Sequence, residues 1–509
     1  MLDRMPTHRP DHPPAPRRRR AALRRETTVA GAAALLLACG TPGVRGVAGT
    51  APAPNAFWTP PPQQTLRAAP PPELPADLAE RIAQLKLADV IDIALRNNTA
   101  TRAAWADARA AAASYGAAKG QYYPTLSVDG SATAVKTVAS AGRTAAKQRF
   151  YGPTLNLSWL LFDFGGRSGS IGEAREALLA ADWTHNATLQ GVVLAVEQAY
   201  FLYVGTKALL AAQQTTLQEA RTNLEAASQR HRVGLATIAD VLQAKTALSQ
   251  AQLALESTDG QIQTTRGALA LSMGLPANVP YDIELPTDTA LALGITDSVD
   301  TLIARAVRER PDLAAVRAQA RAARARVSVA RSRALPSLSV GGNTGETSFF
   351  VDSTNTFTAF RNSYSATLTL SIPLFSGGSQ IYDVKAAAAA AETAAQRAQG
   401  FEQQVVYEVF NAYYALRTAT QQVRTSADLL ASATQSEQVA LGRYRAGAGS
   451  LLDLLTAQAA LAGARAESIQ ARFSWSTALA RLAHDAGILG LDGGSPLRLQ
   501  TDTTGTDNK

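Results

Sequence analysis

Two aspartates that each follow a glycine are the clearest candidates for chemistry in this chain. Asp240 comes after Gly234, and Asp453 comes after Gly447 and Gly449. A carboxylate just beyond a glycine turn stabilises the start of the next helix, because a helix N-terminus carries partial positive charge. The five histidines are scattered, and the sequence has no zinc-protease, nucleophile-elbow, phosphate-loop or paired-cysteine motif. The residue types therefore predict no catalytic residue, no cofactor and no metal site.

Both aspartates belong to a segment that the chain contains twice. Arg230–Gln252 reads RHRVGLATIADVLQAKTALSQAQ, and Arg443–Arg465 reads RYRAGAGSLLDLLTAQAALAGAR. Further echoes lie upstream in each half, PTLSVDG (124–130) with PSLSVGG (336–342) and LNLSWLLFDFGG (155–166) with LTLSIPLFSGG (368–378). A repeat of this length predicts two structural halves instead of many small stacking units.

The net charge of +8 on 509 residues comes mostly from the N-terminus. Met1–Glu26 holds eight arginines against three acids, which leaves only about +3 for the rest of the chain. The body therefore has no electrostatic signature of a nucleic-acid partner. Aromatic residues make up 6% of the sequence, which favours closely packed long helices over a thick globular core.

The N-terminus has the features of an export signal. The basic segment runs directly into VAGAAALLLA and then into Cys39, the single cysteine, which predicts a secretory signal peptide over residues 1–39. Leu36–Cys39 resembles a bacterial lipobox and predicts a lipid anchor on Cys39; ordinary cleavage that leaves a buried free thiol is the alternative. Gly40 stands where an aspartate would retain a lipoprotein in the inner membrane.

Periodicity and breakers divide the remaining chain into two similar halves joined by linkers. A proline-rich linker is predicted over 40–84, an inter-repeat linker over 276–296 and a polar tail over 490–509. The first half (85–275) is predicted to have helices over 85–120, 170–232 and 238–273 and strands over 123–134 and 152–162. The second half (297–489) is predicted to have helices over 298–333, 380–444 and 451–486 and strands over 336–348 and 362–375.

The strands alternate strictly between apolar and small polar residues, most clearly from Tyr364 to Ile372. This pattern is typical of a barrel strand with one apolar and one wet face, and roughly ten residues suffice to cross a bilayer. A half-buried hairpin on a soluble sheet is the alternative for any single pair. Four such strands cannot close a barrel, but three chains related by cyclic symmetry would supply twelve. The long helical hairpins would then continue the barrel as a tube, which predicts a conduit.

The duplicated helix–strand–strand–helix order, the strand motifs LSWLLFDFGGR and LTLSIPLFSGG and the two glycine-containing turns resemble the TolC-type outer-membrane factors. The resemblance covers about residues 85–490. It implies a membrane α+β fold, in which a homotrimeric twelve-stranded outer-membrane β-barrel continues as a long α-helical periplasmic barrel. It also implies outer-membrane lipid contacts and docking, through a periplasmic adaptor (membrane fusion) protein, to an inner-membrane RND pump or ABC transporter.

The family keeps its gate at the periplasmic tips of the helical hairpins. Asp453 matches the first acid of the family's acidic pair, and Thr456 stands in place of the second. Tyr444 and Asp240 match two members of an inter-helix bridge, and Gly449 replaces its arginine. The resemblance thus implies a gate in which Tyr444 bonds to Asp240. Three Asp453 carboxylates around a constriction would favour cations; stabilisation of the helix start is the alternative and compatible role.

The predicted function is a passive exit duct for drugs or small molecules, without catalysis and driven by an inner-membrane pump. The FDFGGR motif favours a second use, type I secretion of a haemolysin-like protein toxin, whereas the lipobox favours efflux. A lipid-anchored periplasmic coiled-coil adaptor or scaffold is the alternative from another class. Such a scaffold has no need for four strands of alternating polarity.

Overall fold

The computed structural model describes residues 84–136, 147–284, 294–295, 297–351, 356–489 and 499–500. The predicted signal peptide with Cys39, the linker up to residue 83 and the tail other than residues 499–500 lie outside the described residues.

Each half of the described chain contributes two short helices, two strands and a long helical hairpin. The first half comprises α3 (Leu87–Asn97), α4 (Thr99–Gly120), β1 (Thr125–Lys136), β2 (Lys147–Phe162), α5 (Gly166–Arg232) and α6 (Ile238–Ser272). The second comprises α7 (Val299–Glu309), α8 (Pro311–Ser332), β4 (Ser337–Val351), β5 (Thr356–Ser371), α9 (Ser379–Arg445) and α10 (Leu451–Asp485). The short strands β3 (Gly294–Ile295) and β6 (Leu499–Gln500) pair with each other.

The prediction of a single helix over 85–120 and another over 298–333 is wrong in one respect, because each range contains two helices in the structure. The first breaks at Asn98, whose extended backbone leaves its side chain free to accept a hydrogen bond from Ala100 N at 2.8 Å. The second breaks at Arg310, because a proline disfavours helical geometry in the residue before it and Pro311 follows. The two breaks occupy matching places in the two halves.

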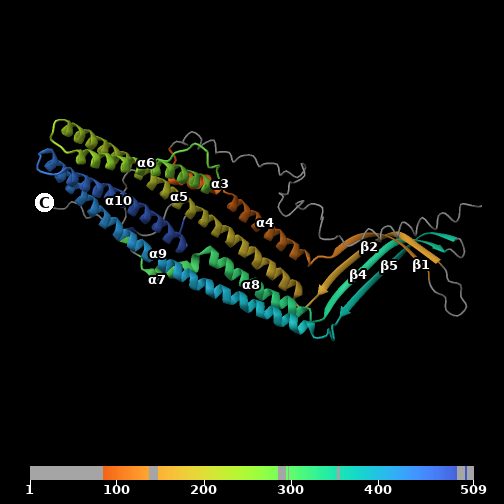
Figure 1. Ribbon diagram of the computed structural model, residues 1–509. Helices are drawn as coiled ribbons and strands as arrows, with labels where there is room; N and C mark the ends of the chain where they lie inside the picture. The colour runs from red at the N-terminus through yellow and green to blue at the C-terminus, as the bar shows by residue number, and fades with distance from the viewer. Residues whose placement is uncertain are drawn as a thin grey trace, which may run out of the picture. The chain divides into compact units, whose positions relative to one another are not determined.

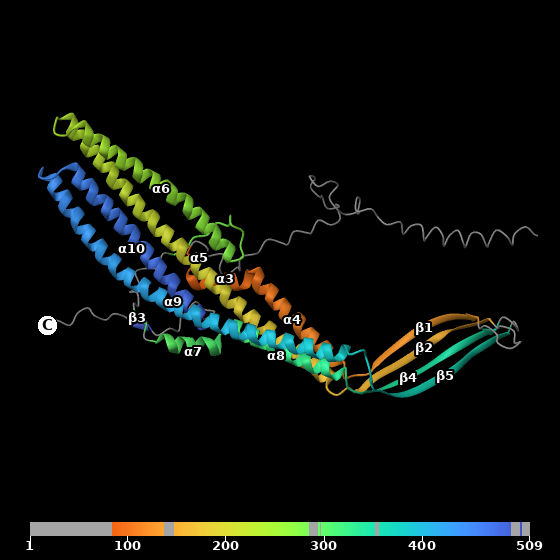
Figure 2. The same ribbon diagram turned by 60° about the horizontal axis from the view of Figure 1, so that its bottom comes forward.

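The long helices α5 and α9 each have 67 residues, roughly 100 Å at a rise of about 1.5 Å per residue. Neither contains proline, and each ends at a glycine turn from which α6 or α10 returns alongside it. Figures 1 and 2 show these turns at one end of the helices and the strands at the other.

The main hydrophobic core lies where α3, α7 and the C-terminal parts of α6 and α10 pack on the middle of α5 and α9 (Figure 2). Its fully buried members include Val90, Ile93, Val193, Val196, Leu269, Leu302, Val405, Val409 and Leu482. By composition and length, α5 contains a stretch apolar enough to cross a membrane. α5 contributes Val193, Val196 and Tyr200 to this core, so packing buries part of its apolar residues.

The four long strands form one antiparallel sheet in the order β1-β2-β4-β5. Within the described chain, β1 and β5 are its edges, and their outer sides are unpaired. Figure 2 shows the four strands side by side, curving away from the ends of α4, α5, α8 and α9.

Candidate functional site

The two helical hairpins turn at equivalent glycines. Gly234 has φ +78° and Gly447 has φ +72°, a left-handed conformation that glycine adopts without steric penalty. In the first turn Leu235 N donates to Arg230 O at 2.8 Å, and in the second Ala448 N donates to Arg443 O at 2.8 Å. These bonds satisfy the last carbonyls of α5 and α9 and end both helices at the same place.

Both candidate aspartates close a hydrogen-bonded box at the start of the returning helix. Asp240 accepts from Thr237 N at 2.8 Å, and Asp240 N donates to Thr237 Oγ1 at 3.2 Å. Asp453 accepts from Ser450 N at 3.2 Å, and Asp453 N donates to Ser450 Oγ at 3.1 Å. Hydrogen bonds from these capping residues hold the pKa of both carboxyls below the ordinary aspartate value. Asp240 and Asp453 therefore both stabilise the start of a helix, α6 and α10 respectively.

Among the described residues of the single chain, Tyr444 and Asp240 are not bonded to each other, and Asp240 bonds to Thr237 of its own turn. Tyr444 is buried beside Ala227 and Leu454. Its ring lies under the guanidinium of Arg230, which also donates to Tyr444 O at 3.3 Å. Arg230 therefore joins the end of α5 to the end of α9, a role that the sequence reasoning missed.

Further bonds join α5 to α10 below the tips. Asn223 Nδ2 donates to Gln458 Oε1 at 2.5 Å, and Arg465 Nη1 lies 3.1 Å from Glu219 Oε1. Because each pair has one residue from each half of the chain, these bonds hold the two hairpins of one protomer side by side. They do not involve the turns themselves.

The sheet at the other end has two different faces. Directly opposed residues of antiparallel strands point to the same face, and the register places Leu126 opposite Leu157 and Ser127 opposite Asn156. The apolar face carries Leu126, Val128, Leu155, Leu157, Trp159, Leu338, Val340, Leu368 and Leu370. The wet face carries Ser127, Asp129, Thr154, Asn156, Ser339, Asn343, Ser365, Thr367 and Thr369. Leu126 is 66% exposed and Leu368 is 65% exposed, so no part of the described chain covers the apolar face.

Exposed aromatic side chains gather where the strands meet the helices. They are Tyr122, Tyr123, Phe162, Phe164 and Phe375. Trp159 Nε1 donates to Tyr122 O at 2.9 Å, and the rings of Phe162 and Phe164 meet edge to face with centroids 4.6 Å apart. Aromatic residues at the boundary of an apolar strand face are typical of the membrane–water interface.

Arg167 fastens the sheet to α5, and the sequence reasoning did not single it out as a site residue. Its buried guanidinium donates to Leu160 O at 2.5 Å and to Leu161 O at 2.9 Å, at the end of β2. The Tyr122 ring packs against the same guanidinium at 4.9 Å. The local signal was the run FDFGGR, in which Gly165 has φ +94°, a left-handed conformation that favours glycine where the chain turns from β2 into α5.

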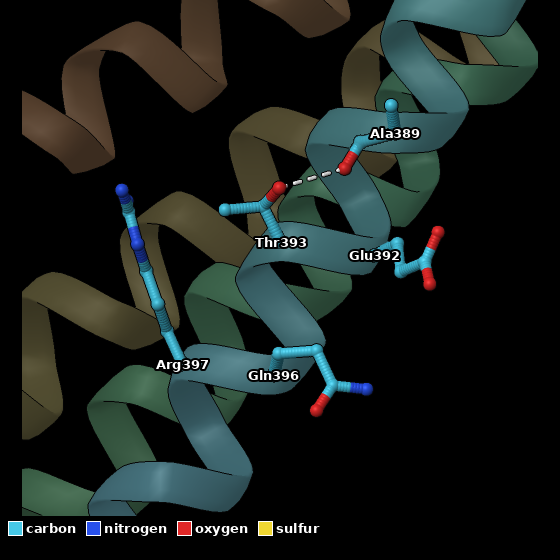
Figure 3. Close-up of a pocket in the computed structure, with 5 residues that line it drawn as sticks. All are labelled: Ala389, Glu392, Thr393, Gln396 and Arg397. Carbon is cyan, nitrogen blue, oxygen red and sulfur yellow. Dashed lines mark hydrogen bonds between the residues drawn. The ribbon is translucent and has the colours of Figure 1, made fainter.

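A surface hollow of about 560 Å³ lies along α9 and is lined by Ala389, Glu392, Thr393, Gln396 and Arg397. Figure 3 shows that Thr393 and Arg397 point to one side of the helix and Glu392 and Gln396 to the other. Thr393 Oγ1 bonds to Ala389 O at 2.9 Å, within the same helix. These polar groups do not converge, and the hollow has no arrangement typical of a ligand site.

Several known proteins resemble this chain along most of their length. Protein CyaE of Bordetella pertussis is 29% identical over 422 residues, which is 82% of this chain and 88% of the relative. The probable efflux pump outer membrane protein TtgC of Pseudomonas putida is 26% identical over 396 residues, or 77% and 80% of the two chains.

Solved structures share the fold. The outer-membrane channel OprN superimposes with a TM-score of 0.72 at 21% identity and covers 80% of this chain and 90% of its own. The CmeC outer membrane channel of Campylobacter jejuni gives 0.69 at 20% identity, with 79% and 85% covered. The family described as outer membrane efflux protein matches twice, over residues 90–275 and 302–487. Since these two matches, one per repeat, span well over half of the sequence, the chain belongs to the outer membrane efflux protein family.

Proposed function

We propose that this protein is the passive exit duct of a tripartite transport system, through which an inner-membrane pump drives small molecules across the outer membrane. The observation that carries the proposal is the two-faced sheet joined to the long hairpins. An uncovered apolar face suits lipid, and a hydroxyl-rich opposite face suits a water-filled lumen. The aromatic boundary marks where the membrane would end and the periplasmic helices begin.

The duct requires more than one copy, and three is the number we propose. Unpaired strand edges are not tolerated in lipid, so β1 and β5 each need a partner strand. In a cyclic trimer β5 of one copy would pair with β1 of the next, which gives a closed barrel of twelve strands. Each chain has two equivalent hairpins, so the same axis would arrange six hairpins into a nearly six-fold tube.

The gate of this duct is proposed to lie at the hairpin tips, around Asp240, Tyr444 and Asp453. The left-handed glycines of both turns support this location, because they allow a narrow tip in which side chains from both hairpins meet. The second turn is tightly packed, because a Cβ on Gly449 would approach Arg443 Cβ to 3.1 Å. If Asp453 lines the constriction, Asp453→Ala weakens block by multivalent cations. Unchanged block confines Asp453 to its capping role.

The proposed cargo is a drug or another small molecule, moved with a periplasmic adaptor and an RND pump. Support comes from the relatives, since TtgC is named as an efflux pump outer membrane protein. The FDFGGR segment, whose Arg167 clamps the strand end, favours the alternative of protein secretion with an ABC transporter. A deletion strain separates the two uses. Drug sensitivity with unchanged secreted proteins supports efflux, and loss of a secreted protein supports secretion.

A lipid on Cys39 is a further part of the proposal and rests on the Leu36–Cys39 motif alone. Metabolic labelling with palmitate tests it. The label should appear in the natural protein and be absent from Cys39→Ala; equal labelling of both removes the anchor from the proposal.

Two measurements on the purified protein test the duct itself. Gel migration should change from a trimer to a monomer on heating in detergent, and planar bilayers should show discrete conductance steps. A periplasmic scaffold would stay soluble without detergent and give no channels, and that result would reject the duct.

A further inference from the structure

The hairpin tips carry more positive than negative side-chain charge. The tips are defined here as residues 229–241 and 442–454, which occupy matching places in the two halves. They contain Arg230, Arg232, Arg443 and Arg445 against Asp240 and Asp453, which is a net charge of +2 per chain with histidine neutral. The next charged residues on the first hairpin, Glu225 and Lys245, cancel each other. On the second hairpin the next charge before the tip is Glu437, which accepts from Gln458 Nε2 at 3.4 Å.

Two of the four arginines are occupied by structural contacts. Arg230 covers the Tyr444 ring and donates to Tyr444 O. Arg443 Nη2 donates to Ala448 O at 3.3 Å across its own turn. Their charge remains at the tip, but their positions are fixed by these bonds.

The other two arginines, Arg232 and Arg445, occupy the same place in the two repeats. Both lie in the last turn of a long helix and are exposed. Within the part of the chain that the structure describes, neither takes part in a side-chain hydrogen bond or an ion pair. These two guanidinium groups are therefore available to solutes that approach the tip.

The helix ends do not reverse the sign of this charge. The C-termini of α5 and α9 carry partial negative charge, but the N-termini of α6 and α10 begin at the same turns and carry the compensating positive charge. The aspartates are engaged as well, because Asp240 and Asp453 direct a carboxylate oxygen to Thr237 and Ser450. The net arginine excess therefore sets the local potential.

The wet face of the sheet adds no net charge. In the regular stretches of the four strands its two ionisable residues are Asp129 on β1 and Arg361 on β5. Asn156 Nδ2 donates a hydrogen bond to the Asp129 carboxylate at 2.6 Å. Since one carboxylate and one guanidinium oppose each other in sign, the wet face of the sheet gives no net preference for anions or cations.

We infer that Arg232 and Arg445, repeated in three copies, form a cationic collar at the periplasmic entrance that favours anionic cargo over cations. This inference rests on the proposed trimeric duct. The ion preference it predicts is opposite to that of the cation-favouring entrance expected from Asp453 alone. In the trimer the tips would carry +6, three times the +2 of one chain. The field would act across the entrance at low salt, because the Debye length is about 30 Å at 0.01 M and about 3 Å at 1 M.

The test is the reversal potential of the full-length protein in planar bilayers under a potassium chloride gradient. At low ionic strength the natural protein should pass chloride in preference to potassium. The double variant Arg232→Gln with Arg445→Gln should lower the chloride-to-potassium permeability ratio by on the order of twofold or more. The difference should vanish near 1 M salt.

Arg397→Gln is the matched control, because Arg397 is an exposed arginine of α9 outside the tips, and it should leave the ratio unchanged. An unchanged ratio in the double variant would overturn the collar. A preference for potassium that Asp453→Asn abolishes would overturn it as well and restore the acidic entrance. The complete absence of channels is a different result, because it rejects the duct and not only its selectivity.

Discussion

Arg230 holds Tyr444 by two contacts at once. Its guanidinium carbon lies 4.3 Å from the centre of the Tyr444 ring, and its Nη2 lies 3.3 Å from Tyr444 O. The two residues are far apart in sequence and come from different repeats. In a duct with its gate at the tips, this contact ties the end of one hairpin to the end of the other.

Arg230→Ala should therefore loosen the tips and increase the open fraction of the channel. A cation–π contact of this kind contributes about 1 kcal/mol, and three copies would act around one entrance. Single-channel recording gives the open fraction, and Arg221→Ala, an exposed arginine on the same helix, provides the control. An open fraction equal to that of the natural protein would show that the contact is structural only.

The capping box of α10 gives a second prediction, which concerns local stability. Ser450→Ala removes the side chain that accepts from Asp453 N, and loss of such a cap costs about 1 kcal/mol. Amide hydrogen exchange in the first turn of α10 should become several-fold faster. Ser476→Ala, in the C-terminal third of the same helix, should leave that turn unchanged. Equal exchange in both variants would contradict the importance of the cap.

Features that depend on local chemistry could be predicted from the sequence. Alternating polarity indicated the strands, and glycine followed by an aspartate indicated the turns between long helices. The break at Arg310 was also local, since Pro311 signals it, but the continuous helical pattern on both sides concealed it. These predictions needed only residues close together in the chain.

The partner of Tyr444 could not be predicted in this way. The repeat alignment pairs Arg230 with Arg443, so the sequence presents the two arginines as equivalent. In the structure Arg443 bonds within its own turn and Arg230 crosses to the other hairpin. That difference arises from the packing of α5 against the second hairpin. It therefore depends on contacts between residues that are distant in the sequence.

Arg310 gives a third prediction, because it is buried among acids at the break between α7 and α8. It lies 2.6 Å from Asp312 and 2.8 Å from Glu408, and it donates to Asp485 O at 3.3 Å. Arg310→Ala leaves the carboxylates of Asp312 and Glu408 without this partner, and breaking such a partly buried network costs about 3 kcal/mol. A clear fall in the thermal transition temperature should follow.

Two further variants test whether the loss of stability in Arg310→Ala comes from the unpaired acids at this buried position. Arg308→Ala, which removes an exposed neighbouring arginine, should change the transition temperature little. Arg310→Met combined with Glu408→Met should recover part of the loss, because it removes both charges of one pair. If the double variant were no more stable than Arg310→Ala, the unpaired Glu408 carboxylate would not explain the fall in transition temperature.

Glu197 gives a prediction about pH. This residue of α5 is buried, its Oε2 has no hydrogen-bond partner among the described residues, and burial raises its pKa to about 7. Above its ordinary value of 4.5 the unfolded chain releases this proton, while the folded chain retains it up to about pH 7. The group therefore lowers stability as pH rises through this window, by about 3 kcal/mol per chain in total. Glu197→Gln should raise the thermal transition temperature at pH 8 and have little effect near pH 5. A difference between the two proteins that stays constant from pH 5 to pH 8 would show that Glu197 is not protonated in the folded core.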